Sequence, residues 1–479
     1  MVAMIPSPLP QDLKTGILHL GLGAFHRAHQ AAYTQDAIVK AGGDWGIEAV
    51  SMRNPALSQT LNAQNGRYTL IERHPGGPRL IDMTVIRAAH ALPGNAALVA
   101  SRMADPAIRI ITITVTEKGY GTLTGQQKLD RADPAITHDL ANAEDPQSLV
   151  GLLCLGLSLR RKAGHGGLTI ISCDNLPENG QLLRAIVDEF ARETDPTLAT
   201  WITEFCRFPS SMVDRITPSS TNDTFALAHQ ALGHSDPAAV ETEPFRQWVI
   251  EDNFAGPRPA WQAASALIVP DVTPFETMKL RLLNGAHSMI AYLGALAGLP
   301  YVRDVMANAD LRALIRHHMS DAATTLSPLP GYDPESYADA LIDRFANPAI
   351  DHRCLQIAMD GSQKLPQRIF APARDRLDRD RSTQSFALAV AAWIRFAEGR
   401  DDAGQPLNLD DPLADEIRAA LASAVASAKD KVNAIANLGA LADHGMLAVP
   451  EFRAEVARHL DRLSHDGILS AVRAALSQR

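Results

Sequence analysis

The sequence predicts an N-terminal α/β domain built on a parallel sheet, followed by a mostly α-helical C-terminal domain. At 479 residues the chain is too long for one hydrophobic core. Before about residue 270, short β-branched runs alternate with helical stretches; after it, the sequence is rich in Ala and Leu at helical spacing. We therefore predict two domains, residues 1–270 and 271–479.

The strands of the first domain are expected where near-continuous apolar or threonine runs occur. Such runs suit a parallel sheet that helices cover on both faces. The clear candidates are residues 17–20, 46–52, 109–116 and 168–173. From residue 274 onward the Pro and Gly punctuation separates amphipathic segments, which predicts helices.

Composition and charge exclude several classes of function. The net charge of -9 disfavours a nucleic-acid partner, since that needs clustered Lys and Arg. We find no apolar run that could span a membrane and no secretion signal, so we expect a cytoplasmic protein. The absence of a C-x-x-C pair argues against disulfides and structural zinc, and we expect four reduced cysteines: Cys154, Cys173, Cys206 and Cys354.

A glycine turn follows the first predicted strand. Gly21 and Gly23, with a helical stretch from Ala24, are typical of a Rossmann-type turn whose amides hold a pyrophosphate. His26 stands where the third glycine would fall, so the motif is incomplete and two-glycine turns also occur without nucleotides. The predicted cofactor-binding residues are Gly21, Gly23, Ala24, Phe25, Arg27 and Arg53.

The basic residues around this turn allow more than one interpretation. His26 and His29 share a helix face, yet no carboxylate or cysteine at ligand spacing accompanies them, so packing is favoured over metal binding. Arg27 could meet a cofactor phosphate. The second strand ends in SMRNP without the acid that selects NAD, so Arg53 leaves NADP open.

The stretch FETMKLRLLNGAHSMIAYLG carries a second constellation. In an α-helix the side chains of Lys279, Asn284 and His287 lie at about 0°, 140° and 80° around the helix axis, within one side of the helix. A solvated helix face is the plain alternative, but the surrounding leucines favour burial. Asn175 follows the strand at 168–173, at the edge of the sheet where α/β folds gather ligands.

These residue types suit the oxidation of a secondary alcohol. Transfer of hydride to a nicotinamide requires a base for the hydroxyl proton and donors for the charge on oxygen. A lysine can act as the base if its surroundings lower its pKa. Amides such as Asn284 and Asn175 can donate to the oxygen, and His287 can bind a neighbouring hydroxyl.

Six blocks in order resemble the polyol-specific long-chain dehydrogenase family, which includes mannitol 2-dehydrogenase, fructuronate reductase and D-arabinitol dehydrogenase. The resemblance covers nearly the whole chain. It is carried by HLGLGAFHRAHQ, TVTEKGY, SCDNLPENG, FPSSMVDRITP, KLRLLNGAHS and IAMDGSQKLPQR. It implies a zinc-independent, nicotinamide-dependent enzyme with a Rossmann-type domain, a helical domain and the site between them.

The resemblance also implies roles for individual residues. Lys279 matches the general base, and Asn175 and Asn284 match the residues that hold the reacting oxygen. His287 matches a substrate-binding histidine. Asp214 and Lys364 match positions expected to bind the polyol chain, and Glu117 and Glu276 could belong to a proton path. Arg368 is a further predicted substrate-binding residue. A carboxylate at Glu276, so close to the lysine, would also raise its pKa.

One departure from the family bears on the substrate. Gln356 stands where members acting on mannitol can carry an arginine, which brings the loop closer to the fructuronate reductase type. A uronate substrate needs a cation for its carboxylate, and Arg368, Arg281 or Arg215 are candidates.

The predicted function is an NAD-dependent dehydrogenase interconverting mannitol and fructose, with NADP as the other possible cofactor. Fructuronate reductase (D-mannonate oxidoreductase) is the first alternative, and a non-catalytic nucleotide-sensing protein the second. The expected partner is a small polyol or ketose, with no nucleic acid or membrane partner. A monomer is compatible with this function.

Overall fold

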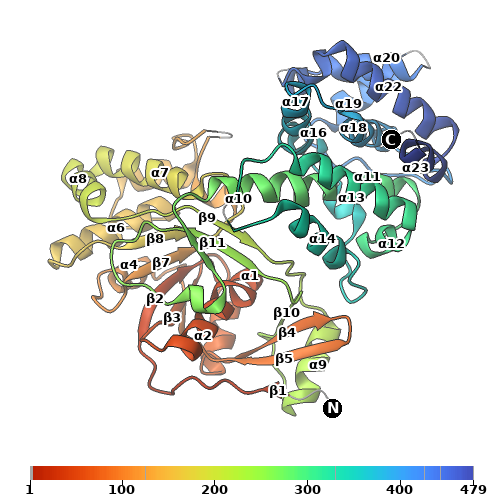
Figure 1. Cartoon of the computed structure of the whole chain (residues 1–479). Coiled ribbons are helices and arrows are strands. Elements are labelled where there is room, and N and C mark those ends of the chain that lie inside the picture. Colours follow the sequence, from red (N-terminus) through yellow and green to blue (C-terminus); the bar gives the residue numbers. More distant parts are fainter. Residues whose placement is uncertain (1–3, 124–125, 330, 425–426, 443, 478–479) are drawn as a thin grey trace. The chain divides into compact units, whose positions relative to one another are not determined.

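The computed structural model describes residues 4–123, 126–329, 331–424, 427–442 and 444–477. Contacts within the chain divide it into two compact units, Met1–Thr273 and Pro274–Arg479. The first unit contains the strands of the described chain, whereas the second is built from helices (Figure 1). The expected fold class, an α/β domain with a parallel sheet followed by a helical region, is confirmed.

A five-stranded parallel sheet forms the centre of the first unit. Its strands are β2 (Thr15–Leu20), β3 (Gly46–Ser51), β6 (Ile86–Ala91), β7 (Ile110–Ile113) and β8 (Thr169–Ser172). Their order across the sheet is β6-β3-β2-β7-β8. Strands β3 and β6 therefore follow on one side of β2, and the chain then crosses to the other side of β2 with β7 and β8. Such a reversal leaves a crevice at the carboxyl ends of the two central strands.

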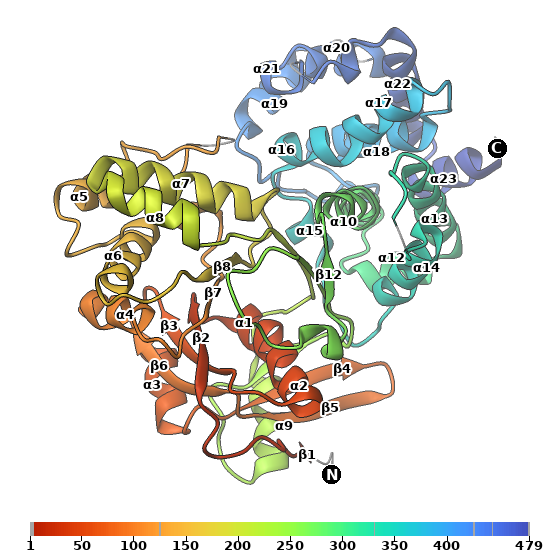
Figure 2. The same ribbon diagram turned by 60° about the vertical axis from the view of Figure 1, so that its left-hand side comes forward.

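Apolar side chains cover both faces of this sheet, because successive residues of a strand point to opposite sides. Leu18 and Leu20 pack with Leu153 in one core, while Ile17 and Trp248 belong to the other. Helices α4 (Ala96–Met103), α6 (Leu149–Lys162) and α7 (Asn179–Thr194) contribute to the first core, and α2 (Gln30–Ala41) contributes to the second (Figure 2).

Two further sheets of the first unit were not expected from the sequence. One has the order β1-β5-β4-β10 and the other β12-β11-β9. Their strands are short or carry charged residues, which hides the apolar pattern. They are β1 (Met4–Ile5), β4 (Tyr68–His74), β5 (Gly77–Met83), β9 (Ser211–Asp214), β10 (Val240–Thr242), β11 (Gln247–Glu251) and β12 (Leu267–Val269).

The remaining helical segments of the first unit connect these strands. The expected helix after the glycine turn is divided at His29, so it begins as the short α1 and continues as α2. The segments are α1 (Ala24–Ala28), α3 (Ala56–Ala63), η1 (Glu117–Tyr120), α5 (Pro134–Ala141), α8 (Pro196–Phe205), α9 (Asn222–Leu232) and η2 (Trp261–Ala264).

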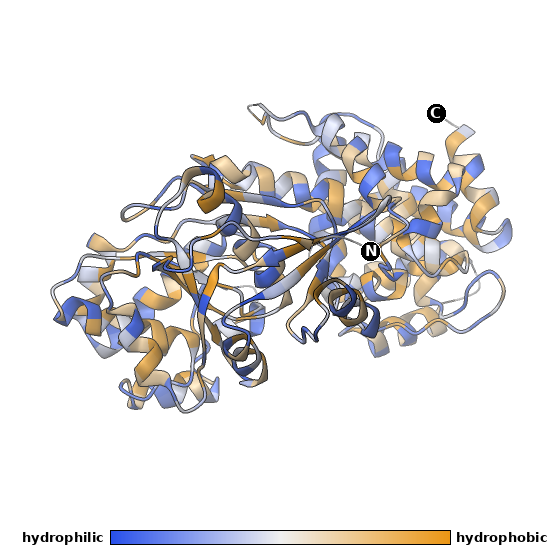
Figure 3. Cartoon of the chain, turned by 90° about the horizontal axis from the view of Figure 1, so that it is seen from below, coloured by the Kyte–Doolittle hydropathy of each residue, from blue (hydrophilic) through white to orange (hydrophobic). Residues whose placement is uncertain are grey.

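Two apolar helices form the core of the second unit. Every residue of α11 (Gly285–Leu296) is buried, as is nearly all of α18 (Gln384–Ala397). The surrounding helices combine apolar and polar residues, as Figure 3 shows by colour. They include α12 (Val302–Ala307), α13 (Ala309–Ala323), α14 (Pro334–Phe345), α15 (Cys354–Ile357), α17 (Ala371–Leu377), α19 (Ala414–Ser423), α20 (Ala428–Ala436), α21 (Gly439–Ala442), η5 (Met446–Ala448), α22 (Pro450–His465) and α23 (Ile468–Ser477).

Among the described residues, no helix combines the length and the apolar character that crossing a membrane would require.

Candidate functional site

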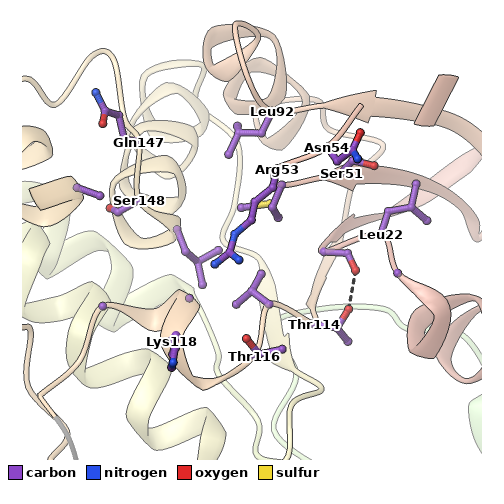
Figure 4. Close-up of a pocket in the computed structure, with 18 of the residues that line it drawn as sticks. Leu22, Ser51, Arg53, Asn54, Leu92, Thr114, Thr116, Lys118, Gln147 and Ser148 are labelled. Atoms are coloured by element: carbon purple, nitrogen blue, oxygen red, sulfur yellow. Dashed lines mark hydrogen bonds between the residues drawn. The ribbon is translucent and has the colours of Figure 1, made fainter. Parts of the chain in front are cut away.

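A cavity of about 690 Å³ lies at the carboxyl end of the parallel sheet in the first unit (Figure 4). It is placed where β2, β3 and β7 end, at the reversal of strand order. Open α/β sheets bind ligands at this point. Its lining includes Gly21, Gly23, Ser51, Arg53, Thr114 and Lys118.

Gly21 allows β2 and β7 to approach each other closely where they end. Its φ is +107°, and a Cβ atom at this position would lie 2.0 Å from the Thr114 carbonyl oxygen. No other residue type fits such a place. The amides of Gly21 and Leu22 both donate to the carbonyl of Val50, each at 2.9 Å, so the turn is also tied to β3.

Gly23 has a different reason to be a glycine. Its φ of -137° is open to any residue, and a Cβ would meet no neighbour closer than 3.7 Å. Since Gly23 lines the cavity, its missing side chain keeps the space beside the turn free. Ala24 and Phe25, which follow in α1, pack against the core of the first unit.

Arg27 serves the fold of the first unit rather than the cavity lining. It is buried, its guanidinium donates to the carbonyls of Ala238 and Gly23, and Tyr68 donates its hydroxyl to the Arg27 carbonyl at 2.7 Å. The structure therefore offers no support for the expected contact between Arg27 and a cofactor phosphate. Its partners from residues 68 and 238 are too distant in sequence to be anticipated.

His26 and His29 are also buried in the first unit. The His26 ring stacks on His19 with centroids 3.4 Å apart. The His29 Nε2 atom bonds the Gln247 carbonyl at 2.9 Å, and its Nδ1 atom bonds Gln30 at 3.0 Å. Burial lowers the pKa of His29 to about 3 and that of His26 well below its usual range. Both imidazoles are therefore neutral packing residues.

Arg53 lies on the lining of the cavity, just beyond the end of β3, and is exposed (Figure 4). The Oδ1 atom of the neighbouring Asn54 accepts a 2.9 Å bond from the amide of Ala56, the first residue of α3. Asp133 is the carboxylate among the cavity-lining residues, and it is engaged as the cap of α5. The described lining thus places a cation, and no acid, at the end of β3.

The loop after β8 is held by Asp174. Its carboxylate accepts bonds from the amides of Val115 and Thr116 at 3.0 and 3.1 Å, and from the Tyr120 hydroxyl at 2.8 Å. Asn175, the next residue, is exposed. Sequence reasoning missed Asp174 as the anchor, although an acid directly after a buried strand was a usable signal.

Two other residues predicted for the site, Glu117 and Asp214, also lie in the first unit. Glu117 is exposed at the start of η1, which follows β7. Asp214 is buried at the end of β9. The next residue, Arg215, is committed to an ion pair with Glu72 at 2.7 Å and to the Glu243 carbonyl.

In the second unit, the predicted lysine helix is not a regular α-helix. After α10 (Thr273–Met278), residues Lys279–Asn284 form the π-helix η3, which leads directly into α11. Hydrogen bonds of a π-helix join residues five apart, so Lys279 and Asn284 lie one above the other. The angle of about 140° expected for an α-helix is therefore wrong, and the difference brings the two residues closer.

The lysine helix is buried over most of its length. Lys279 is 6% exposed and His287 is 7% exposed, so the expectation of a buried polar face is supported against that of a solvated one. Glu276 lies one turn before Lys279 in α10 and is half-buried. The carboxylate of Glu276 therefore lies close to Lys279 in the sequence.

His287 sits in an apolar and cationic environment. Its ring lies 4.5 Å from Phe345 and 5.2 Å from His352, centroid to centroid. Burial, and then the charges of His352, Arg344, Arg368 and Lys279, hold the pKa of His287 well below its usual range. Its Nε2 atom has no hydrogen-bond partner among the described residues, so this neutral imidazole retains a polar atom for a ligand.

A second π-helix carries Arg368. It is η4 (Pro366–Phe370), which continues from α16 (Gly361–Leu365). The Arg368 guanidinium makes long bonds to the Asn284 carbonyl at 3.4 Å and to Ser288 Oγ at 3.3 Å. The backbones of the two segments are also close at Gly285, where a Cβ would lie 3.1 Å from the Arg368 carbonyl oxygen. The two π-helices therefore pack against each other.

Lys364 and Arg281 complete the cations of the second unit that were singled out from the sequence. Lys364 donates to the Met359 carbonyl and lies 3.5 Å from Asp360. Burial, with a further contribution from Arg368, lowers its pKa. Arg281 is paired with Asp375 at 2.6 Å, so its charge is already compensated.

The described residues contain no group of three or more His, Cys, Asp or Glu side chains arranged to hold a metal ion. The cysteines are free and buried.

A glycine turn beside a cavity at the switch point of a parallel sheet defines a dinucleotide-binding Rossmann domain, here joined to a helical domain with a buried lysine. The class is thus a Rossmann-type protein with an added helical unit, and the family models and relatives make it an oxidoreductase. More particularly, the chain belongs to the mannitol dehydrogenase family. Residues 15–263 match the model of the mannitol dehydrogenase Rossmann domain, and residues 271–464 match that of the mannitol dehydrogenase C-terminal domain.

Individual relatives extend over most of the chain. The D-mannonate oxidoreductase of Escherichia coli (strain K12) is 42% identical over 87% of this chain and 89% of its own. A mannitol 2-dehydrogenase of Pseudomonas fluorescens, solved as a ternary complex with NAD and D-mannitol, is 33% identical with a TM-score of 0.83, covering 100% and 97% of the two chains. A substrate-free D-sorbitol dehydrogenase is 30% identical with a TM-score of 0.91, covering 98% and 100%.

Proposed function

We propose that this protein is an NAD-dependent polyol dehydrogenase of the mannitol 2-dehydrogenase type, which converts D-mannitol and NAD⁺ to D-fructose and NADH. The observation that carries the proposal is the π-helix that stacks Asn284 over a buried Lys279. We further propose that the enzyme works in the cytoplasm on small polyols or ketoses, a role with which a monomer is compatible.

The cavity of the first unit fits a dinucleotide. Its volume of about 690 Å³ lies within the range of cofactor pockets, and the open space beside Gly23 suits a pyrophosphate. Gly21, Gly23 and Arg53 would hold the cofactor, whereas Ala24 and Phe25 would support the turn. When bound, the nicotinamide accepts the hydride from the alcohol carbon.

The lysine helix supplies the proton chemistry in this proposal. Lys279 takes the proton from the reacting hydroxyl, and Asn284 donates its amide to the oxygen as charge develops there. His287, neutral and with Nε2 available, binds a neighbouring hydroxyl. Asn175, Asp214 and Lys364 as substrate ligands, and Glu117 and Glu276 as a proton path, remain predictions from the family resemblance.

Replacing the lysine tests this assignment. Lys279→Met is expected to lower kcat by about 10²–10⁴-fold, the usual contribution of a general base, while NADH binding measured by fluorescence is unchanged. Lys431→Met is the matched control, because Lys431 is a partly buried lysine of the second unit engaged with Glu398 at 2.7 Å. A Lys279→Met enzyme with turnover close to wild type would refute the role and favour a non-catalytic nucleotide sensor.

D-mannonate is a second candidate substrate, and a specific observation favours it. The Arg368 guanidinium makes long hydrogen bonds to neutral oxygens, whereas Arg215 and Arg281 are paired with carboxylates. With His287 surrounded by cationic groups, this part of the second unit suits a carboxylate-bearing chain. Gln356, at the position where an arginine can occur in mannitol enzymes, is exposed in α15.

A paired assay separates the two substrates. NADH oxidation is measured with fructose and, separately, with fructuronate, in the wild type and in Arg368→Gln. Dominant turnover with fructose would support the mannitol reaction. If fructuronate dominates and Arg368→Gln raises the KM for fructuronate more than the KM for fructose, the mannonate reaction is the correct one.

A further inference from the structure

His19 is the penultimate residue of β2, two residues before Gly21, and is completely buried. It does not line the cavity. Its Nδ1 atom lies 2.8 Å from Thr112 Oγ1, and its Nε2 atom lies 3.0 Å from Thr114 Oγ1. Thr112 lies in β7, where it pairs with His19, and Thr114 directly follows the last residue of β7. The imidazole thus bridges the two central strands where the cofactor turn begins.

The hydrogen-bond donors in this bridge can be assigned. The Thr114 hydroxyl donates its hydrogen to the Gly21 carbonyl at 2.8 Å (Figure 4). A hydroxyl has one hydrogen, so its oxygen accepts from His19, and Nε2 carries the proton. Burial lowers the pKa of His19 to about 3, so the ring is neutral and Nδ1 accepts from Thr112. The chain of bonds runs from Thr112 through His19 and Thr114 to Gly21.

The ring of His26 holds His19 in place within this series of hydrogen bonds. Its ring stacks on His19 at 3.4 Å with an interplanar angle of 11°, and both residues are buried. Stacking restricts rotation of the His19 imidazole about its own axis only weakly. It prevents a change of the His19 side-chain rotamer, because the His26 ring fills the space beside it. His26, which stands where the third glycine of the turn would fall, therefore restricts the position of the His19 imidazole.

We propose that His19 is a positioning residue for the dinucleotide: through Thr114 it holds the Gly21 carbonyl, and it thereby orients the amides of the cofactor turn. The Gly21 carbonyl and the following Leu22 amide belong to the same peptide plane. Thr114 holds this plane at its carbonyl and Val50 holds it at its amide, so the backbone of the turn that follows starts from a fixed position. Because Thr114 and Gly21 both line the cavity, the effect reaches the cofactor. The inference rests on the proposed binding of NAD at this turn.

Two pairs of variants test the role. His19→Phe keeps an aromatic ring to stack on His26 but loses both bonds, and Thr114→Val loses the hydroxyl at constant size. Each is expected to raise the KM for NAD and the Kd for NADH about tenfold, equivalent to roughly one hydrogen bond, with the KM for the polyol and kcat at saturating NAD unchanged. His19→Gln, which retains a donor near Nε2, and Thr114→Ser are expected to restore the KM for NAD.

Thr169→Val is the matched control. Thr169 is a buried threonine of β8 in the same sheet, and its hydroxyl accepts from the Ala255 amide at 2.9 Å. It is expected to lower the Tm without changing the KM for NAD. If His19→Phe does not fold, Thr114→Val and Thr114→Ser decide the matter.

The inference is overturned if both first variants leave the KM for NAD unchanged, or if they raise the KM values for NAD and polyol in equal proportion. It is also overturned if Thr114→Ser behaves like Thr114→Val. A wild-type protein that binds no NADH would instead refute the proposed function itself, before any variant is made.

Discussion

The imidazoles of His19, His26 and His29 link the folding of the first unit to pH. Burial lowers the pKa of His19 and of His29 to about 3, from an ordinary 6.5, and holds that of His26 well below its usual range. In the unfolded chain these groups bind protons below about pH 6.5. Folding therefore requires their neutral forms, and protonation favours the unfolded state.

The stability of the protein is expected to fall with acid. The contribution of these histidines is fully present above pH 6.5 and is lost as the pH falls toward 3, by about 2 kcal/mol for each residue at pH 5. Melting curves at pH 7.5 and pH 5.0 should show a lower Tm at pH 5.0. His29→Gln should reduce the difference, whereas the exposed His465→Gln should not. Equal Tm values at both pH values would contradict this prediction.

At the scale of single elements, the turn after β2 shows two glycines with separate roles. Gly21 is needed for the close approach to Thr114 and for a positive φ, whereas Gly23 is needed for the open space of the cavity. The first role concerns folding and the second concerns the ligand. Substitution by alanine should therefore separate stability from cofactor affinity.

Gly21→Ala is expected to lower the free energy of unfolding by at least about 1–3 kcal/mol, because it places a Cβ in a strained and crowded position. Gly23→Ala should leave the Tm unchanged, since the new methyl group meets no protein atom closer than 3.7 Å. It should weaken NADH binding, because the methyl group would occupy space beside the cavity. Thermal melting and NADH titration of the two variants check this. A Gly23→Ala protein with wild-type affinity would argue against cofactor binding beside this turn.

The helix that carries Lys279 shows how a correct element can have an unexpected geometry. Its sequence indicated a helix with a buried polar face, and both features are present. The π-helical hydrogen bonding was not expected, because an α-period of 3.6 residues is the default. Packing of η3 against η4, with Gly285 in contact with the Arg368 backbone, depends on residues more than eighty positions apart.

At the scale of the whole molecule, a ligand that binds only the folded state stabilises it. NAD at about 100 times its Kd should add about 2.7 kcal/mol to the free energy of unfolding and raise the Tm. NADP at equal concentration should have a smaller effect, and kcat/KM should be higher with NAD. A preference for NADP would point to Arg53, which lies on the cavity lining after β3, and Arg53→Ala should then remove it.

The sequence by itself determined the α/β and helical fold classes, four of the five strands of the parallel sheet, the glycine turn and the lysine helix, but not β6. These features depend on local composition and on periodicity along a short stretch of chain. The family relationship likewise rests on short motifs in a fixed order.

Only the tertiary structure decided which charged and polar residues remain available to a ligand. Arg27 binds the Ala238 carbonyl, Arg215 pairs with Glu72, and Arg281 pairs with Asp375, while His26 packs on His19. Most of these partners lie far away in the sequence and meet only when the cores form. A side chain's burial and its compensating charge are properties of that packing, which no local pattern contains.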